Sequence, residues 1–137
     1  MSLVIDSSIT LAWLFEDERT PAADAVLRHV TESGAVVPSL WRLEVANALQ
    51  MAVKRKRITA AFRDASIADL RALEVNIDAE TDRHAWTTTL QLAEQCRLTL
   101  YDAAYLELAR RLDLPLATLD EELRAASAAV GVTLLGA

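Results

Sequence analysis

The sequence predicts an α/β fold, a three-layer α/β/α sandwich built on a parallel sheet of about five strands. Short apolar segments that suit buried strands recur along the chain, and longer segments with helical periodicity separate them. Parallel strands need crossover connections, and helices in those connections cover both faces of the sheet. The expected strands are Leu3–Asp6, Ala35–Val37, Glu74–Ile77, Pro115–Thr118 and Val132–Leu135.

Helices in the first half of the chain are marked by residues that favour helix ends. Thr20 and Pro21 suit an N-cap and a first helical residue, and Gly34 ends the same helix. Ser39 and Thr59 are expected to cap the next two helices, because their hydroxyls can accept a hydrogen bond from the first turn. The expected helices are Ser8–Phe15, Pro21–Ser33, Leu40 to about Lys56 and Ala60 to about Leu73.

The second half of the chain continues the alternation of helices and strands. The expected helices are about Asp82–Arg97, Leu100–Leu112 and Glu121–Val130. Gly131 ends the last of them. Glu107 and Arg111 lie one turn apart on the middle helix, and we expect them to form a pair on its solvent face.

Length and composition suit an ordinary globular domain. The chain has 137 residues, which predicts a single domain over residues 1–137. Its net charge of −6 argues against broad attraction to nucleic acid or anionic lipid, but it permits a local basic patch or a carboxylate site that binds a cation. Cys96 is the one cysteine, so we expect a small buried hydrophobe and neither an internal disulfide nor a cysteine metal cluster.

Targeting signals are not expected in this sequence. No apolar run approaches the ~20 residues that cross a bilayer. The N-terminal residues MSLVID lack the basic region of a signal peptide. We therefore expect a cytoplasmic protein that does not contact membranes.

Two carboxylates lie at or just after the ends of predicted strands. Asp6 ends the first strand, and Asp120 comes shortly after the fourth. If the strands are parallel, both side chains lie at the same edge of the sheet, where ligands bind in such folds. Each residue also precedes a helix, so N-capping alone is the alternative explanation.

Two further carboxylates are expected to point inward from helices. Asp102 shares a helical face with Tyr105 and Ala109, which makes that face the one directed at the core. Glu44 lies beside the apolar stripe of its helix and too far from the start to act as a cap. A buried carboxylate needs a partner, and a salt bridge, a water network or a metal ion would each serve.

Together these four carboxylates predict a metal site. Clustered carboxylates repel one another, and a divalent cation relieves that repulsion. Oxygen ligands without cysteine favour Mg²⁺ or Mn²⁺ over Zn²⁺. Such a site suits phosphodiester hydrolysis, because the metal generates a nucleophilic water and stabilises charge on the phosphate.

Several segments carry a resemblance to a known family. They are VIDSSITLAWL, VPSLWRLEVANAL with the following VKRKRI, LTLYDAAYLELARRLDLPLATLDEELRAAS, and the closing GVTLL. Through them the chain resembles PIN domains from end to end, and more narrowly the VapC-type ribonuclease toxins of type II toxin–antitoxin pairs. The most specific segment is YDAAYLELA, followed by a strand and T-x-D.

The resemblance implies a site and a mechanism. It assigns the catalytic metal ligands to Asp6, Glu44, Asp102 and Asp120. It assigns supporting polar roles to Ser8, Asn47 and Thr118. It implies a PIN-like sandwich, usually a homodimer, that cuts RNA endonucleolytically with Mg²⁺ or Mn²⁺ and a metal-activated water. A small antitoxin protein would bind across the active-site groove and block it.

Three other functions stay open at this point. The chain could be a non-catalytic module that acts only by binding its antitoxin, or an RNA-processing nuclease that is not a toxin. It could also be a metal-dependent phosphatase or receiver-like domain. Those folds commonly use a late lysine, and no lysine follows Lys56 here, which weighs against the third possibility.

A few remaining residues have alternative roles. The basic run of Lys54, Arg55, Lys56 and Arg57 could be solvated, bind RNA phosphates or bind an acidic segment of the antitoxin. Glu121 and Glu122 are expected to be solvated, and the three tryptophans are expected in the core or in an interface. These are Trp13, Trp41 and Trp86.

Overall fold

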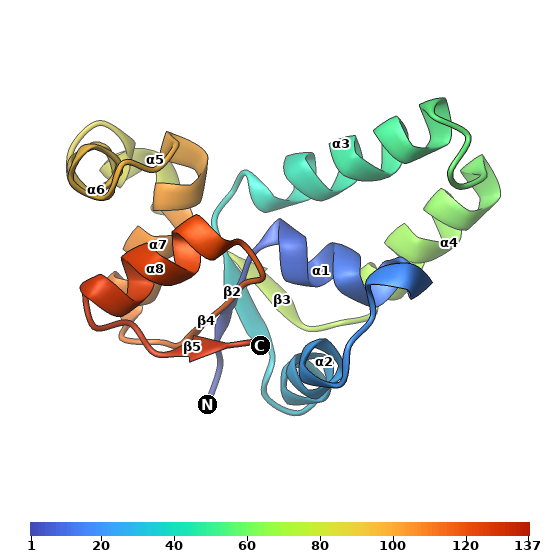
Figure 1. Cartoon of the computed structure of the whole chain (residues 1–137), viewed down its shortest axis with the longest axis horizontal. Coiled ribbons are helices and arrows are strands. Elements are labelled where there is room, and N and C mark those ends of the chain that lie inside the picture. The colour runs from blue at the N-terminus through green and yellow to red at the C-terminus, as the bar shows by residue number, and fades with distance from the viewer.

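A five-stranded parallel sheet forms the centre of the molecule (Figure 1), as the computed structural model of residues 1–137 shows. The strands lie side by side in the order β3-β2-β1-β4-β5. Every neighbouring pair is parallel. The strands are β1 (Val4–Ile5), β2 (Ala35–Val37), β3 (Val75–Ile77), β4 (Leu116–Ala117) and β5 (Leu134–Leu135). The predicted fold class is confirmed. β2 has the predicted bounds, and each of the other four strands is shorter than the segment predicted for it.

The connections run in two directions from β1. The first two lead outward to β2 and β3, and they contain α1 (Ser7–Leu14), the short 3₁₀ helix η1 (Glu16–Glu18), α2 (Pro21–Ser33), α3 (Trp41–Lys54) and α4 (Ala60–Arg71). The last two lead to β4 and β5 on the other side, and they contain α5 (Thr81–Ala85), α6 (Thr88–Cys96), α7 (Leu100–Leu112) and α8 (Glu121–Ala129). Figure 1 shows α7 and α8 on one side of the sheet and α1 and α2 on the other.

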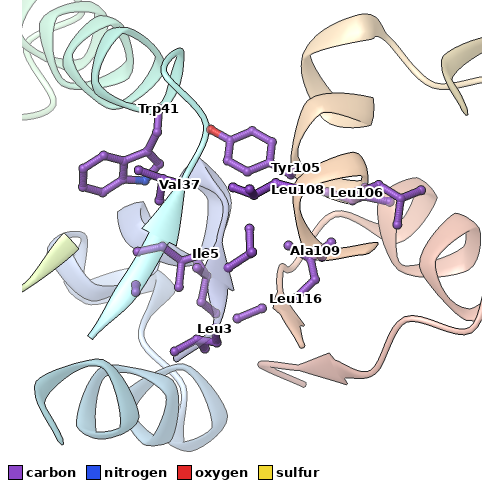
Figure 2. Close-up of a cluster of buried hydrophobic side chains, with 14 of the residues drawn as sticks. Leu3, Ile5, Val37, Trp41, Tyr105, Leu106, Leu108, Ala109 and Leu116 are labelled. Atoms are coloured by element: carbon purple, nitrogen blue, oxygen red, sulfur yellow. The ribbon is translucent and has the colours of Figure 1, made fainter. Parts of the chain in front are cut away.

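One part of the core lies between the sheet and α7 (Figure 2). Residues 103–109 of α7 are all buried, whereas the ends of the helix are more exposed. On the sheet, Leu3, Ile5, Val37 and Leu116 are fully buried. This burial packs the middle of α7 against the strands.

Local signals placed several helix ends correctly. The Thr20 and Thr59 hydroxyls accept hydrogen bonds from Ala23 and Phe62 and cap α2 and α4. Gly34 follows α2 with a φ of 74°, a backbone conformation that favours glycine.

The cap predicted at Ser39 is wrong. Leu40 is the N-cap of α3 and makes no side-chain capping bond. The backbone N–H of Ser39 instead donates to the hydroxyl of Thr81, 42 residues away. The helix thus begins one residue later than predicted and has no side-chain cap.

The helix predicted over Asp82–Arg97 is two helices. Trp86 and Thr87 separate α5 from α6, and Thr87 has non-helical angles of φ −120° and ψ −99°. The backbone N–H and the hydroxyl of Thr87 both donate to the carbonyl of His84, which competes with a continuous helix. Because of the break, α6 takes a new direction and packs against α7.

Glu107 and Arg111 form the predicted pair, but the prediction that it is solvent-exposed is wrong. The side chain of Glu107 is only 5% exposed and that of Arg111 is 18% exposed. Arg111 also binds Asp78, which follows β3, so the pair belongs to a largely buried ionic cluster. No helix in the structure combines the length and the apolar composition needed to span a membrane.

Candidate active site

The edge of the sheet where β1 and β4 end is the natural ligand-binding position of this fold. The two strands are neighbours, with Val4 opposite Leu116 and Ile5 opposite Ala117. The chain leaves β1 toward one edge of the sheet and leaves β4 toward the other. Parallel α/β sheets bind ligands at such a reversal of strand order, outside the carboxyl ends of the strands.

Asp6 occupies this position and is 4% exposed. Its carboxylate caps α1 by accepting a hydrogen bond from the backbone N–H of Ile9 at 3.1 Å. The Ser8 hydroxyl donates to Oδ1 at 2.7 Å, and the Thr118 hydroxyl donates to Oδ2. Both carboxylate oxygens are therefore oriented by the protein.

The Asp6 carboxylate is hard to ionise despite these donors. Burial raises its pKa to about 6, the hydrogen bonds oppose the rise, and the charge of Asp102 adds to it. Capping accounts for the bond from Ile9, but it explains neither the burial nor the two hydroxyl donors.

Ser8 and Thr118 also join the loop after β1 to the loop after β4. The Ser8 hydroxyl accepts from the backbone N–H of Leu119 at 2.9 Å, and the Thr118 hydroxyl accepts from that of Asp120 at 3.0 Å. Asp120 itself caps α8 by accepting from Leu123 at 2.8 Å. The two hydroxyls thus fix the backbone that carries Asp120 beside Asp6.

Glu44 approaches the site from the first turn of α3 and is half-buried. Its partner is the hydroxyl of Tyr105, which donates to Oε1 at 2.5 Å, so it has no salt bridge. Burial raises the pKa of Glu44, the Tyr105 bond opposes that rise, and the charge of Asp102 reinforces it. Asn47, one turn further on, is exposed and makes no side-chain hydrogen bond, so the structure does not bring it into the site.

Asp102 approaches from the first turn of α7, where Thr99 is the N-cap. Burial raises the pKa of Asp102, and the charges of Asp120 and Glu122 raise it further. Asp102 in turn raises the pKa values of Asp6 and Glu44. Asp102 is thus coupled by charge to Asp6, Glu44 and Asp120, and it is the one carboxylate that links all the others.

The site has no balancing positive charge from the chain. None of Asp6, Glu44, Asp102 and Asp120, hereafter the four crevice carboxylates, takes part in a salt bridge. No three histidine, cysteine, aspartate or glutamate side chains are close enough together in the structure to hold a metal ion. The carboxylates would have to move closer to share one. The donor set nevertheless fits a divalent cation, since it offers oxygen ligands whose negative charge is partly desolvated and unpaired.

Sequence reasoning missed one contact at the site. The sequence predicts Tyr105 on the core face, and its position three residues after Asp102 is the available signal that its hydroxyl reaches the same region. Glu121 and Glu122 are exposed, as predicted, and the charge of Glu122 adds to the rise in the pKa of Asp102. The T-x-D segment with its following glutamates gave no means of choosing between Glu121 and Glu122.

The basic run at the end of α3 lies away from the four crevice carboxylates, and only its last residue, Arg57, forms salt bridges. Arg57 binds Asp17 and Glu18 at 2.9 and 2.8 Å and lies 4.1 Å from the ring centroid of Phe15. Lys54, Arg55 and Lys56 are exposed and form no salt bridges.

The remaining predicted residues take varied positions. Trp13 and Trp41 belong to the core, whereas Trp86 is 89% exposed. Cys96 is partly buried and packs against the core.

Comparisons with known proteins agree with the fold. The PIN domain family matches residues 3–129. Ribonuclease VapC3 from Pyrobaculum aerophilum is 30% identical over 127 residues, which cover 90% of this chain and 92% of that protein. The crystal structure of PAE2754 from Pyrobaculum aerophilum superimposes with a TM-score of 0.70 at 25% identity, covering 98% of this chain and 92% of that one. The chain belongs to the PIN domain family and is a VapC-type member of it.

Proposed function

We propose that this chain, as a single PIN domain over residues 1–137, is a metal-dependent endoribonuclease that acts as the toxin of a toxin–antitoxin pair. The observation that carries the proposal is that the four crevice carboxylates are electrostatically coupled through Asp102 and have no basic partner from the chain. The relationship to a ribonuclease of the VapC type supports RNA as the substrate. A small antitoxin protein, a second copy of the chain and a cytoplasmic location are the expected partners and setting.

In this proposal Asp6, Glu44, Asp102 and Asp120 hold Mg²⁺ or Mn²⁺. The bound cation would supply Lewis-acid activation of water and of the scissile phosphate. Ser8 and Thr118 orient the two oxygens of Asp6 through the bonds described above, so this ligand is fixed before any ion arrives. Asn47, exposed and unbonded, has no part in the proposal.

Folding already excludes most water from the Asp6 carboxylate. A carboxylate that is 4% exposed can lose little contact with solvent when an ion binds. The desolvation cost has therefore been met by folding, and ion binding recovers favourable electrostatic energy. These carboxylates would repel RNA phosphates until a cation neutralises them, so cation binding should precede RNA binding.

Cleavage of cellular RNA by purified protein freed of any antitoxin tests the proposal. We expect discrete fragments with Mg²⁺ or Mn²⁺ and none with EDTA. Asp102→Asn should reduce the cleavage rate by at least about 100-fold, because it removes a proposed metal ligand whose charge acts on the other carboxylates. Asp113→Asn, at the exposed opposite end of the same helix, is the matched control and should cleave normally.

Two outcomes would contradict the proposal. Cleavage that survives both EDTA and Asp102→Asn would exclude this metal site. A folded chain that cleaves no RNA, yet arrests growth when expressed, would favour the antitoxin-binding module. RNA cleavage without growth arrest would remove the toxin assignment and leave an RNA-processing nuclease.

A further inference from the structure

Tyr105 links the two helices that carry Glu44 and Asp102. It lies one turn after Asp102 on α7 and is 1% exposed. Its hydroxyl donates to Oε1 of Glu44 on α3, 61 residues away in sequence, at 2.5 Å. In Figure 2 the Tyr105 ring extends from α7, and its oxygen points toward the segment that leads to Trp41 at the start of α3.

The phenol is among the crevice carboxylates and has one partner. Its hydroxyl makes no other hydrogen bond in the structure. Burial raises its pKa far above the ordinary value, and the charges of Glu44, Asp6 and Asp102 raise it further. The group therefore stays protonated at neutral pH and acts as a donor.

A neutral hydroxyl donor leaves the charge of the carboxylate unbalanced, whereas a basic side chain would balance it. On the same helix, Arg111 pairs with Asp78 and Glu107 and balances their charge. At Glu44 the chain supplies a hydroxyl instead, which orients one oxygen but leaves the negative charge in place. A buried tyrosine that only needed an acceptor could have used a backbone carbonyl, as the Trp13 indole does with Ala23.

We propose that Tyr105 is a positioning residue that holds one oxygen of Glu44 and leaves the second oxygen and the full charge to a divalent cation. The inference rests on the proposed function, since it requires the metal site. Tyr105 touches neither RNA nor ion in this role, and it acts through Glu44. Partners of this kind typically change metal affinity by about 10–100-fold when removed.

Mn²⁺ binding, followed from the paramagnetic resonance signal of the free ion, tests the role without requiring activity. Tyr105→Phe keeps the buried ring and removes the hydroxyl, so we expect Mn²⁺ affinity to fall by about 10–100-fold. The chain offers a matched control in its second tyrosine, since Tyr101 is on the same helix, is 64% exposed and forms no side-chain hydrogen bond. Tyr101→Phe should bind Mn²⁺ like the unmodified chain.

A double-mutant comparison separates positioning from general structural support. If Tyr105 acts through Glu44, Tyr105→Phe should weaken Mn²⁺ binding by less than about 2-fold in a chain that already carries Glu44→Gln. An equal loss in both backgrounds would overturn the inference, as would unchanged affinity in Tyr105→Phe alone. Absence of Mn²⁺ binding by the unmodified chain would instead contradict the proposed metal site, and the inference with it.

A second measurement covers the case in which Tyr105→Phe does not fold. The chain contains two tyrosines, so labelling with 3-fluorotyrosine gives two ¹⁹F resonances, which Tyr101→Phe assigns. In the metal-free protein, Glu44→Gln should shift the Tyr105 resonance and leave that of Tyr101 in place. Adding Mg²⁺ to the chain with Glu44 intact should also shift the Tyr105 resonance. A Tyr105 resonance that responds to neither change would overturn the inference.

Discussion

Two groups of carboxylates border α7, and they differ in what balances their charge. The four crevice carboxylates have no basic partner. The second group, here called the Arg111 cluster, consists of Arg111 with Asp78, Glu80 and Glu107. In that cluster Arg111 lies 2.6 Å from Asp78 and 2.8 Å from Glu107, with Glu80 further away at 3.8 Å.

The pKa values of carboxylates in the two groups shift in opposite directions. Burial alone would raise the pKa of Asp78, but the hydrogen bond and charge of Arg111 lower it below its ordinary value. In the crevice, burial raises the pKa values of Asp6, Glu44 and Asp102, and no arginine opposes the rise. The chain thus supplies a cation where the carboxylates support the fold, and it supplies none at the site where we propose that an external cation binds.

The largest expected effect comes from removing the internal cation. Arg111→Met should lower the free energy of unfolding by about 3–5 kcal/mol, because it leaves the largely buried carboxylates of Asp78 and Glu107 without a partner. Urea denaturation measures the change. Arg110→Met is the matched control, since Arg110 is exposed and forms no salt bridge, and it should change stability by less than about 0.5 kcal/mol. Equal effects of the two substitutions would mean that the Arg111 cluster does not stabilise the fold as an ionic group.

The next effect is the dependence of stability on pH in the metal-free protein. The pKa of Asp6 rises from the ordinary 3.8 to about 6 on folding. Its favourable contribution to stability is therefore fully present below pH 3.8 and is lost as pH rises through 6. Asp6→Asn removes this ionisation and keeps a capping side chain.

The difference in unfolding free energy between Asp6→Asn and the unmodified chain should therefore shift in favour of the variant by up to about 3 kcal/mol between pH 4 and 7. Urea denaturation in EDTA at several pH values measures it, and any constant cost of the substitution cancels in the comparison. A difference that stays the same across this interval would show that Asp6 is not destabilised by burial.

The sequence was most informative where the causes are local. Thr20 with Pro21, Gly34 and Thr59 mark helix ends because their effects act within one turn of the chain. The placement of Asp6 and Asp120 also followed from the sequence, because parallel strands bring their carboxyl ends to one edge.

Features that depend on distant residues could not be predicted in this way. The backbone N–H of Ser39 donates to Thr81, which is 42 residues away, and the Arg111 of the predicted surface pair also binds Asp78, which is 33 residues away. The partner of Glu44 is likewise on a helix 61 residues away. Helical periodicity identifies the face on which such a residue lies, but it does not identify the atom opposite.

We propose that the crevice carboxylates bind a cation from outside the chain, and the dependence of stability on added cation tests this most directly. The free energy of unfolding would be measured in EDTA and in Mg²⁺ or Mn²⁺ at equal ionic strength, for the unmodified chain and Asp102→Asn. We expect the unmodified chain to gain about 2.7 kcal/mol when the cation is at 100 times its dissociation constant, and Asp102→Asn to gain much less at the same concentration. No gain, or the same gain in both proteins, would contradict the claim.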